Sequence, residues 1–207
     1  MISIQKQFLF IHVPKTGGNS IQNILKDYSE DDIVTQADHQ DGIERFEVRN
    51  RQYDITKHSS LSHYRSVLDP DTYSKLFKFA VIRNPWDRLI SFYFSPHRGV
   101  NEWRRSDFLE LMKKVRTFQQ YVFEDQPQAH AAKKLDAEID FIIRFEQIER
   151  DFEIVCQKLD IQNTNLPKRN ASTRVHYSKY YDEELIRIVY DKFKAEIEYG
   201  EYSFETL

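Results

Sequence analysis

A short apolar segment followed directly by a pair of glycines constrains the fold of this chain more than any other feature. Residues 8–13 read Phe-Leu-Phe-Ile-His-Val, which predicts a buried strand ending at Pro14. A Lys-Thr-Gly-Gly loop comes next, and apolar residues then recur at helical spacing as Ile21, Ile24, Leu25 and Tyr28. A strand, a loop and a helix in immediate succession are typical of an α/β protein.

The loop has the chemistry of an anion-binding site. A helix start carries unpaired backbone N–H groups and the positive end of the helix dipole. Gly17 and Gly18 let the main chain approach an oxyanion closely, and Lys15 adds a flexible cation with several donors. The alternative interpretation is an ordinary strand-to-helix turn with a surface lysine, because Gly-Gly turns are common in α/β proteins.

Two widespread nucleotide-binding motifs do not fit this loop. The Walker A motif places its lysine after the second glycine, and the dinucleotide motif needs three spaced glycines. The order Pro-Lys-Thr-Gly-Gly-x-Ser after a strand instead resembles the 5′-phosphosulfate loop of sulfotransferases that use 3′-phosphoadenosine 5′-phosphosulfate (PAPS). The resemblance implies that the donor is bound by Pro14, Lys15, Thr16, Gly17, Gly18, Asn19 and Ser20.

A second motif of the same family occurs after another apolar segment, residues 77–82. The family binds the 3′-phosphate of PAPS through Arg-x-Pro-x-x-Arg-x-x-Ser, a pattern present here as Arg83, Pro85, Arg88 and Ser91. Asn84 suits a helix N-cap, and the proline after it suits the first helical position. The resemblance implies that both arginines and the serine bind the 3′-phosphate. Alternatively, the arginines only pair with nearby carboxylates such as Asp87.

The arrangement of apolar segments predicts the fold class. Residues 8–13, 77–82 and 139–145 read as buried parallel strands, and residues 148–159 and 182–193 read as amphipathic helices. With 207 residues the chain suits one α/β domain over 1–207, a three-layer sandwich with a central mainly parallel sheet and a P-loop-like anion cradle. Ligands of such sheets bind beyond the carboxyl ends of the strands, where both motifs fall.

Three other segments are harder to interpret. Residues 29–57 are polar and lack a clear period, which favours a variable excursion. Residues 95–137 carry a helical pattern and either line the acceptor side or form a solvated insertion. In the polar loop at 167–172, the resemblance implies donor contacts from Arg169 and Asn170, and a flexible surface loop is the alternative.

Sulfuryl transfer needs a cation at the leaving oxygen and a base at the acceptor. Lys15 matches the loop lysine of the family and is the candidate cation. The resemblance implies a histidine base from the region between the two motifs, which makes His58 the first choice and His63 the reserve. Either histidine could instead be an ordinary surface residue, and His12 inside the first strand is expected to be packed there.

Composition narrows the class of protein. The chain contains 30 Lys and Arg residues and 33 Asp and Glu residues. The resulting net charge of −3 does not indicate a nucleic-acid-binding protein. The single cysteine, Cys156, excludes an internal disulfide framework. The sequence contains no run of about 18 apolar residues, which a membrane-spanning helix would need. We therefore expect a cytoplasmic protein. The sequence has no clear Walker B strand and no cluster of His, Asp and Glu ligands, so it does not indicate a metal requirement.

The sequence therefore predicts a PAPS-dependent sulfotransferase that acts on a hydroxyl or amine of a carbohydrate or small metabolite. A nucleoside or small-molecule kinase with a variant P-loop is one alternative, and its lysine would be misplaced. A binding module that holds the nucleotide without catalysis is another. The acceptor and the oligomeric state do not follow from the sequence, because one fold hosts many activities.

Overall fold

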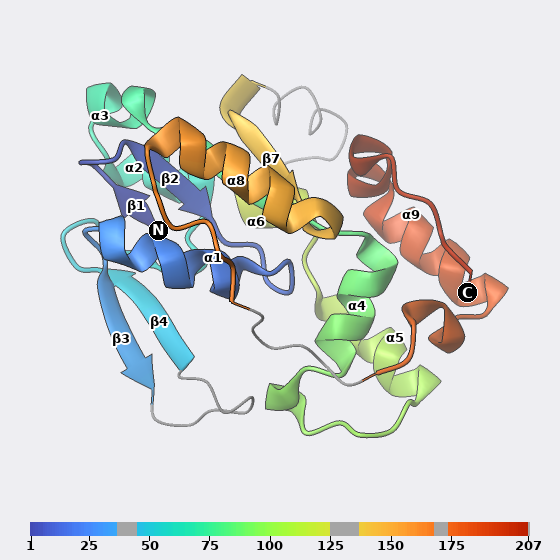
Figure 1. Cartoon of the computed structure of the whole chain (residues 1–207). Coiled ribbons are helices and arrows are strands. Elements are labelled where there is room, and N and C mark those ends of the chain that lie inside the picture. The colour runs from blue at the N-terminus through green and yellow to red at the C-terminus, as the bar shows by residue number, and fades with distance from the viewer. Residues whose placement is uncertain (37–44, 125–136, 168–173, 207) are drawn as a thin grey trace.

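Three parallel strands organise the fold, and each lies within an apolar segment expected from the sequence. We analysed a computed structural model that describes residues 1–36, 45–124, 137–167 and 174–206 (Figure 1). The central sheet has the order β1-β2-β6-β7. Its strands are β1 (Ile2–Ser3), β2 (Phe8–Ile11), β6 (Phe77–Ile82) and β7 (Phe141–Arg144). β1 is antiparallel to β2 and the other pairings are parallel, which confirms a mainly parallel sheet.

Helices cover both faces of this sheet. Alternate strand residues point to opposite faces, so Phe8 and Phe10 pack into one apolar cluster while Leu9 and Ile11 pack into another. The first cluster is closed by α1 (Gly18–Leu25) and α8 (Ile148–Leu159), and the second by α2 (Leu61–Val67) and α6 (Phe118–Phe123). A short α3 (Pro70–Lys75) precedes β6. The mixed α/β architecture in one compact domain agrees with the sequence.

A third apolar cluster lies beside the sheet and is built mainly from helices (Figure 1). Its helices are α4 (Pro85–Tyr93), α5 (Arg105–Lys114) and α9 (Glu183–Gly200), and α9 extends well past the helix expected over 182–193. Short 3₁₀ turns connect the larger elements at η1 (Lys26–Tyr28), η2 (Pro96–Arg98), η4 (Phe145–Gln147) and η5 (Tyr177–Tyr180). Within the described ranges, no helix is both long and apolar enough to cross a membrane.

The polar segment 29–57 contains a sheet that the sequence did not predict. β3 (Asp32–Gln36), β4 (Arg45–Asn50) and β5 (Ile55–Thr56) pair antiparallel in that order. Val48 and Ile55 are buried, but most of the other residues along these strands are polar. Too few apolar positions alternate here to produce the period of two that identifies a half-buried strand.

Candidate functional site

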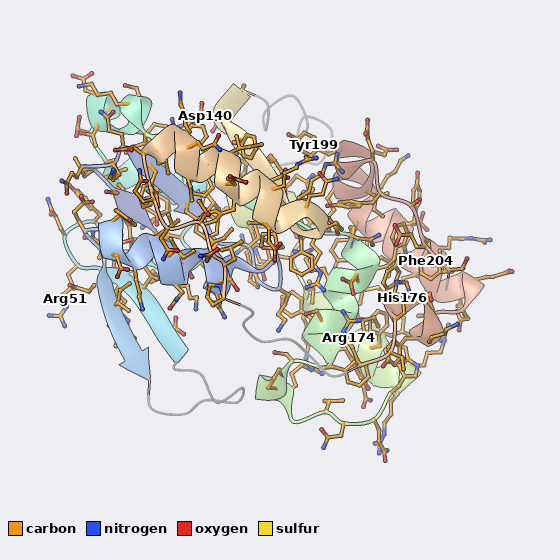
Figure 2. The ribbon with its side chains drawn as sticks, viewed as in Figure 1. Arg51, Asp140, Arg174, His176, Tyr199 and Phe204 are labelled. Atoms are coloured by element: carbon orange, nitrogen blue, oxygen red, sulfur yellow. The ribbon has the colours of Figure 1, made fainter. Side chains whose placement is uncertain are left out.

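A cavity of about 840 Å³ lies beyond the carboxyl ends of the parallel strands. Its wall is assembled from four distant parts of the chain: the loop after β2, the β6–α4 junction, the β7–α8 junction, and residues within 166–177 and 201–205. Arg174 and His176 belong to the last part and lie beside α4 (Figure 2). The two sequence motifs, although more than sixty residues apart, therefore face one cavity.

The glycine pair packs so closely that neither position has room for a side chain. Gly17 adopts a left-handed φ of 83°, and a Cβ placed there would lie 2.7 Å from Cδ1 of Ile148. A Cβ at Gly18 would lie 2.3 Å from Cδ2 of His12. No side chain caps the start of α1 within the described structure. The first three residues of this helix, Gly18, Asn19 and Ser20, line the cavity, so the positive end of the helix dipole lies at its wall.

Lys15 lines the same cavity and has an unusual backbone. Its φ of 67° is left-handed, and its Nζ lies 3.4 Å from Oγ of Ser95. Burial lowers the pKa of Lys15 to about 8, and the nearby charges of Arg83 and Arg174 act in the same direction. An anion in the cavity would oppose these effects, because it favours the charged ammonium group.

Arg83 connects the two motifs directly. Its Nη1 donates to the carbonyl oxygen of Lys15 at 2.8 Å, and its guanidinium lies 3.8 Å from the ring centre of Phe145. Nε and Nη2 donate to one oxygen of Asp87 at 2.8 and 2.5 Å, and Arg174 pairs with the other oxygen. Burial alone would raise the pKa of Asp87, but the two arginines hold it below its ordinary value. Arg83 thus pairs with Asp87, as the alternative interpretation held, and also faces the cavity.

A comparison with protein families decides the broader assignment. The model described as "Sulfotransferase family" matches residues 1–203, almost the whole chain. The chain belongs to the sulfotransferase family. No significant match was found among curated proteins or among solved structures. Sulfuryl transfer is thereby supported in general, and the kinase and binding-module alternatives receive no support.

The second sulfotransferase motif is only partly directed at the cavity. Ser91 lines it and is 7% exposed, whereas Arg88 is not among the lining residues and is 1% exposed. Nη2 of Arg88 lies 3.1 Å from a carboxylate oxygen of Glu196 and donates to the carbonyl of Arg116. Because each helical residue is rotated by about 100° from the last, Arg88 turns into the helical cluster while Asp87 stays at the cavity. Arg88 therefore forms a buried ion pair and does not line this cavity.

The remaining residues of the sulfotransferase loop have distinct positions. Asn19 and Ser20 line the cavity, and Oδ1 of Asn19 is buried without a hydrogen-bond partner among the described residues. Thr16 is 1% exposed, and its hydroxyl donates to the carbonyl of Val13 at 2.8 Å. Thr16 and Pro14 are absent from the described cavity lining, so they shape the loop from behind.

The candidate bases lie at different distances from the cavity. His58 and His63 are both absent from the described cavity lining, but the His58 ring lies 4.8 Å from the ring of His12, which lines it. His63 lies on α2, and its Nε2 is 2.9 Å from the carbonyl oxygen of Asp54. His12 is buried, and burial lowers its pKa well below the ordinary value, as do the charges of His58 and Lys57. Of the two candidate bases, only His58 is in ring contact with a residue that lines the cavity, His12.

The protonation pattern of His58 follows from its backbone contact. Its Nδ1 lies 3.0 Å from the carbonyl oxygen of His12, which can only accept. The neutral ring therefore carries its proton on Nδ1 and leaves the lone pair of Nε2 available. The exposed His58 is partly desolvated at its contact with the main chain of His12, which lowers its pKa, although the hydrogen bond to His12 acts in the opposite direction. The lowered pKa favours the neutral ring, in which Nε2 is an acceptor.

Several lining residues of this sulfotransferase-family chain were not singled out from sequence. Arg144 directly ends β7, so the rule that placed Lys15 and Arg83 beyond strand ends would also have identified it. Glu146 accepts from the backbone N–H of Asn84 at 2.8 Å and from the hydroxyl of Tyr202 at 3.0 Å. Arg174 and Tyr202 lie in segments without a recognisable motif. Arg169 and Asn170, expected to contact the donor, lie outside the described residues.

Among the described residues, no group of three or more His, Cys, Asp and Glu side chains is placed to hold a metal ion. The cations that line the cavity are Lys15, Arg83, Arg144 and Arg174. Carboxylates are also present, and Asp87 and Glu146 among them are engaged in the contacts described above. Fixed cations, hydroxyl groups and helix N–H groups are suitable partners for a ligand with separate anionic groups.

Proposed function

We propose that this protein transfers a sulfuryl group from PAPS to a hydroxyl or amine of a carbohydrate or small-metabolite acceptor. The observation that carries the proposal is that the Lys15 loop and the Arg83–Ser91 pair face one cavity of about 840 Å³. PAPS has a phosphosulfate at one end and a 3′-phosphate on the same nucleoside. Two anion sites in one cavity suit a ligand of that kind better than a ligand with a single charged group.

The residues divide between the two ends of such a donor. The first N–H groups of α1, with Lys15 and Ser20, are suited to the phosphosulfate, because they combine a helix start with a mobile cation. Arg83 and Ser91 are suited to the 3′-phosphate, since a guanidinium and a hydroxyl can both donate to its oxygens. Arg174 adds positive charge beside Asp87.

The proposed chemistry needs a cation and a base. As the acceptor oxygen or nitrogen bonds to sulfur, the bond from sulfur to the bridging phosphate oxygen breaks, and Lys15 stabilises the charge left on that oxygen. Nε2 of His58 takes the proton of the acceptor, because Nδ1 is committed to the carbonyl of His12. The products are the sulfated acceptor and 3′-phosphoadenosine 5′-phosphate (PAP).

The acceptor side is proposed to include α6. The His58 ring lies 6.5 Å from the ring of Tyr121 on α6, within the segment 95–137 that the sequence associates with acceptor binding. The guanidinium carbon of Arg116 lies 4.9 Å from the ring centre of the same tyrosine. An acceptor that reaches His58 would pass this aromatic and cationic surface.

Affinity for PAP is expected to decrease as the pH rises through about 8. The pKa of Lys15 lies near that value in the nucleotide-free protein, so the ammonium group is charged below it and neutral above it. Neutral Lys15 no longer attracts the 5′-phosphate, and binding weakens. Calorimetric titration with PAP between pH 6.5 and 9.5 measures the effect, and Lys15→Arg is the control because its charge persists throughout. A pH-independent affinity of the wild type would contradict this expectation.

The proposal as a whole is tested by nucleotide binding and by transfer. Calorimetry should detect PAP binding to the wild type, weaker binding of adenosine 5′-monophosphate, and a loss of PAP affinity in Arg83→Ala. Incubation with ³⁵S-labelled PAPS and extracts of the source organism should then yield a labelled product, whose identification gives the acceptor. Absence of PAP binding by the folded wild-type protein would overturn the proposal.

A further inference from the structure

The contact between Arg83 and the main chain of Lys15 has a consequence for the cavity. Lys15 is held at a φ of 67°, a left-handed conformation that side-chain-bearing residues seldom adopt and that needs support from surrounding structure. The carbonyl oxygen of this strained residue accepts a 2.8 Å hydrogen bond from Nη1 of Arg83. The support for the turn thus comes from the other anion-binding motif.

Arg83 is itself held in place by two neighbours. Asp87 accepts from its Nε and Nη2, and the ring of Phe145 lies against the face of its guanidinium. Asp87 is also paired with Arg174, so its carboxylate has little freedom to move. A planar guanidinium can bind Asp87 along one edge and the Lys15 carbonyl along another, which a lysine ammonium cannot do in the same geometry.

We infer that Arg83 is a positioning residue for the Lys15 turn as well as a ligand of the second anionic group. The end of the cavity that holds this group would therefore set the geometry of the end that holds the phosphosulfate. This inference rests on the proposed function for the identity of the ligand. The coupling between Arg83 and the Lys15 turn is a contact within the protein and does not depend on that identity. Ser91 provides a matched comparison, because it lines the same end and makes no hydrogen bond to Lys15 in the described structure.

The inference is tested with adenosine 5′-phosphosulfate, which has the phosphosulfate but lacks the 3′-phosphate. Ser91→Ala should weaken PAP binding and leave the affinity for adenosine 5′-phosphosulfate at the wild-type value. Arg83→Lys keeps the charge but loses the planar set of guanidinium donors. It should weaken the binding of both PAP and adenosine 5′-phosphosulfate, each by about tenfold or more, as expected for a lost charge-assisted hydrogen bond. Wild-type affinity of Arg83→Lys for adenosine 5′-phosphosulfate would overturn the inference.

A second variant separates positioning from simple electrostatics. Asp87→Asn removes a negative charge near the cavity, which by charge alone should strengthen the binding of an anion. If Asp87 orients Arg83 and thereby supports the Lys15 turn, the same change should weaken the binding of adenosine 5′-phosphosulfate. Stronger binding by Asp87→Asn would count against the inference. Circular dichroism and thermal unfolding establish that each variant is folded before binding is measured.

A measurement without nucleotide distinguishes this inference from the proposed function. The rate at which Lys15 is acetylated, followed against pH by peptide mass spectrometry, reports the pKa of its amine. In Arg83→Lys a loosened turn exposes Lys15, so its pKa should rise from about 8 towards its ordinary value of 10.5, whereas Ser91→Ala should not change it. An unchanged pKa in Arg83→Lys overturns the coupling. A raised pKa in a protein that does not bind PAP overturns the proposed function alone.

Discussion

Lys15→Ala is expected to lower the rate of sulfuryl transfer by about 10²- to 10³-fold, the effect typical of removing one group that stabilises developing charge. The stability of the fold should change little, because the Lys15 side chain is only partly buried and its Nζ lies at 3.4 Å from Ser95. Single-turnover transfer from ³⁵S-labelled PAPS to the acceptor fraction that the wild type sulfates measures the rate, and denaturant unfolding measures the stability.

The matched control for Lys15 is Ser95→Ala. This change removes the hydroxyl near the lysine Nζ but leaves the ammonium group, so most of the transfer rate should remain. A Lys15→Ala variant that transfers sulfate at the wild-type rate would remove this residue from the chemistry. A variant that has lost both rate and stability would show instead that the lysine has a structural role.

Arg88→Ala is expected to destabilise the protein by about 3–5 kcal/mol, the usual cost of removing one partner from a buried ion pair. Arg88 and Glu196 are each 1% exposed, and burial already raises the pKa of the Glu196 carboxyl. Without Arg88 this carboxylate would lose its counter-ion, although it also accepts from the backbone N–H of Phe118. Equilibrium unfolding in urea, followed by circular dichroism, measures the change.

The control for this buried pair is the double variant Arg88→Met with Glu196→Leu. Replacing both charges by apolar groups of similar volume is often neutral or stabilising, so much of the lost stability should return. Calorimetry with PAP provides the second readout. If Arg88→Ala remains as stable as the wild type but no longer binds PAP, Arg88 is a donor ligand, as its place in the motif first suggested.

Much of the α/β framework was predictable because its segments follow simple periods. The three parallel strands are short apolar runs, and β2 and β6 are buried on both faces. The helix α8 begins and ends where its pattern predicts, at Ile148 and Leu159. The placement of the two motifs at one cavity was predictable for a similar reason. Arg83 directly follows β6 and Lys15 lies in the loop after β2, and parallel strands bring their carboxyl ends to one edge of the sheet.

The remaining features depend on contacts between distant segments, which spacing alone does not encode. The motif contains Arg88, but the direction of its side chain is decided by the packing of α4 against α9, where Glu196 lies. Arg174 lines the cavity and pairs with Asp87, although the two residues are 87 positions apart in the sequence. The strands of the 29–57 region have too few buried apolar residues to differ from a loop by period.

Residues 201–205 complete the cavity, which bears on when a chain under synthesis can first bind a ligand there. Glu201, Tyr202, Ser203 and Glu205 form part of the cavity wall, and Ser203 is fastened to Asn84 by a 3.1 Å hydrogen bond. Because synthesis begins at the N-terminus, a nascent chain that has reached only α8 already carries both anion motifs but lacks this wall. The proposed nucleotide binding should therefore begin only after residue 205 has been synthesised, and chains that stop at α8 should bind the nucleotide poorly.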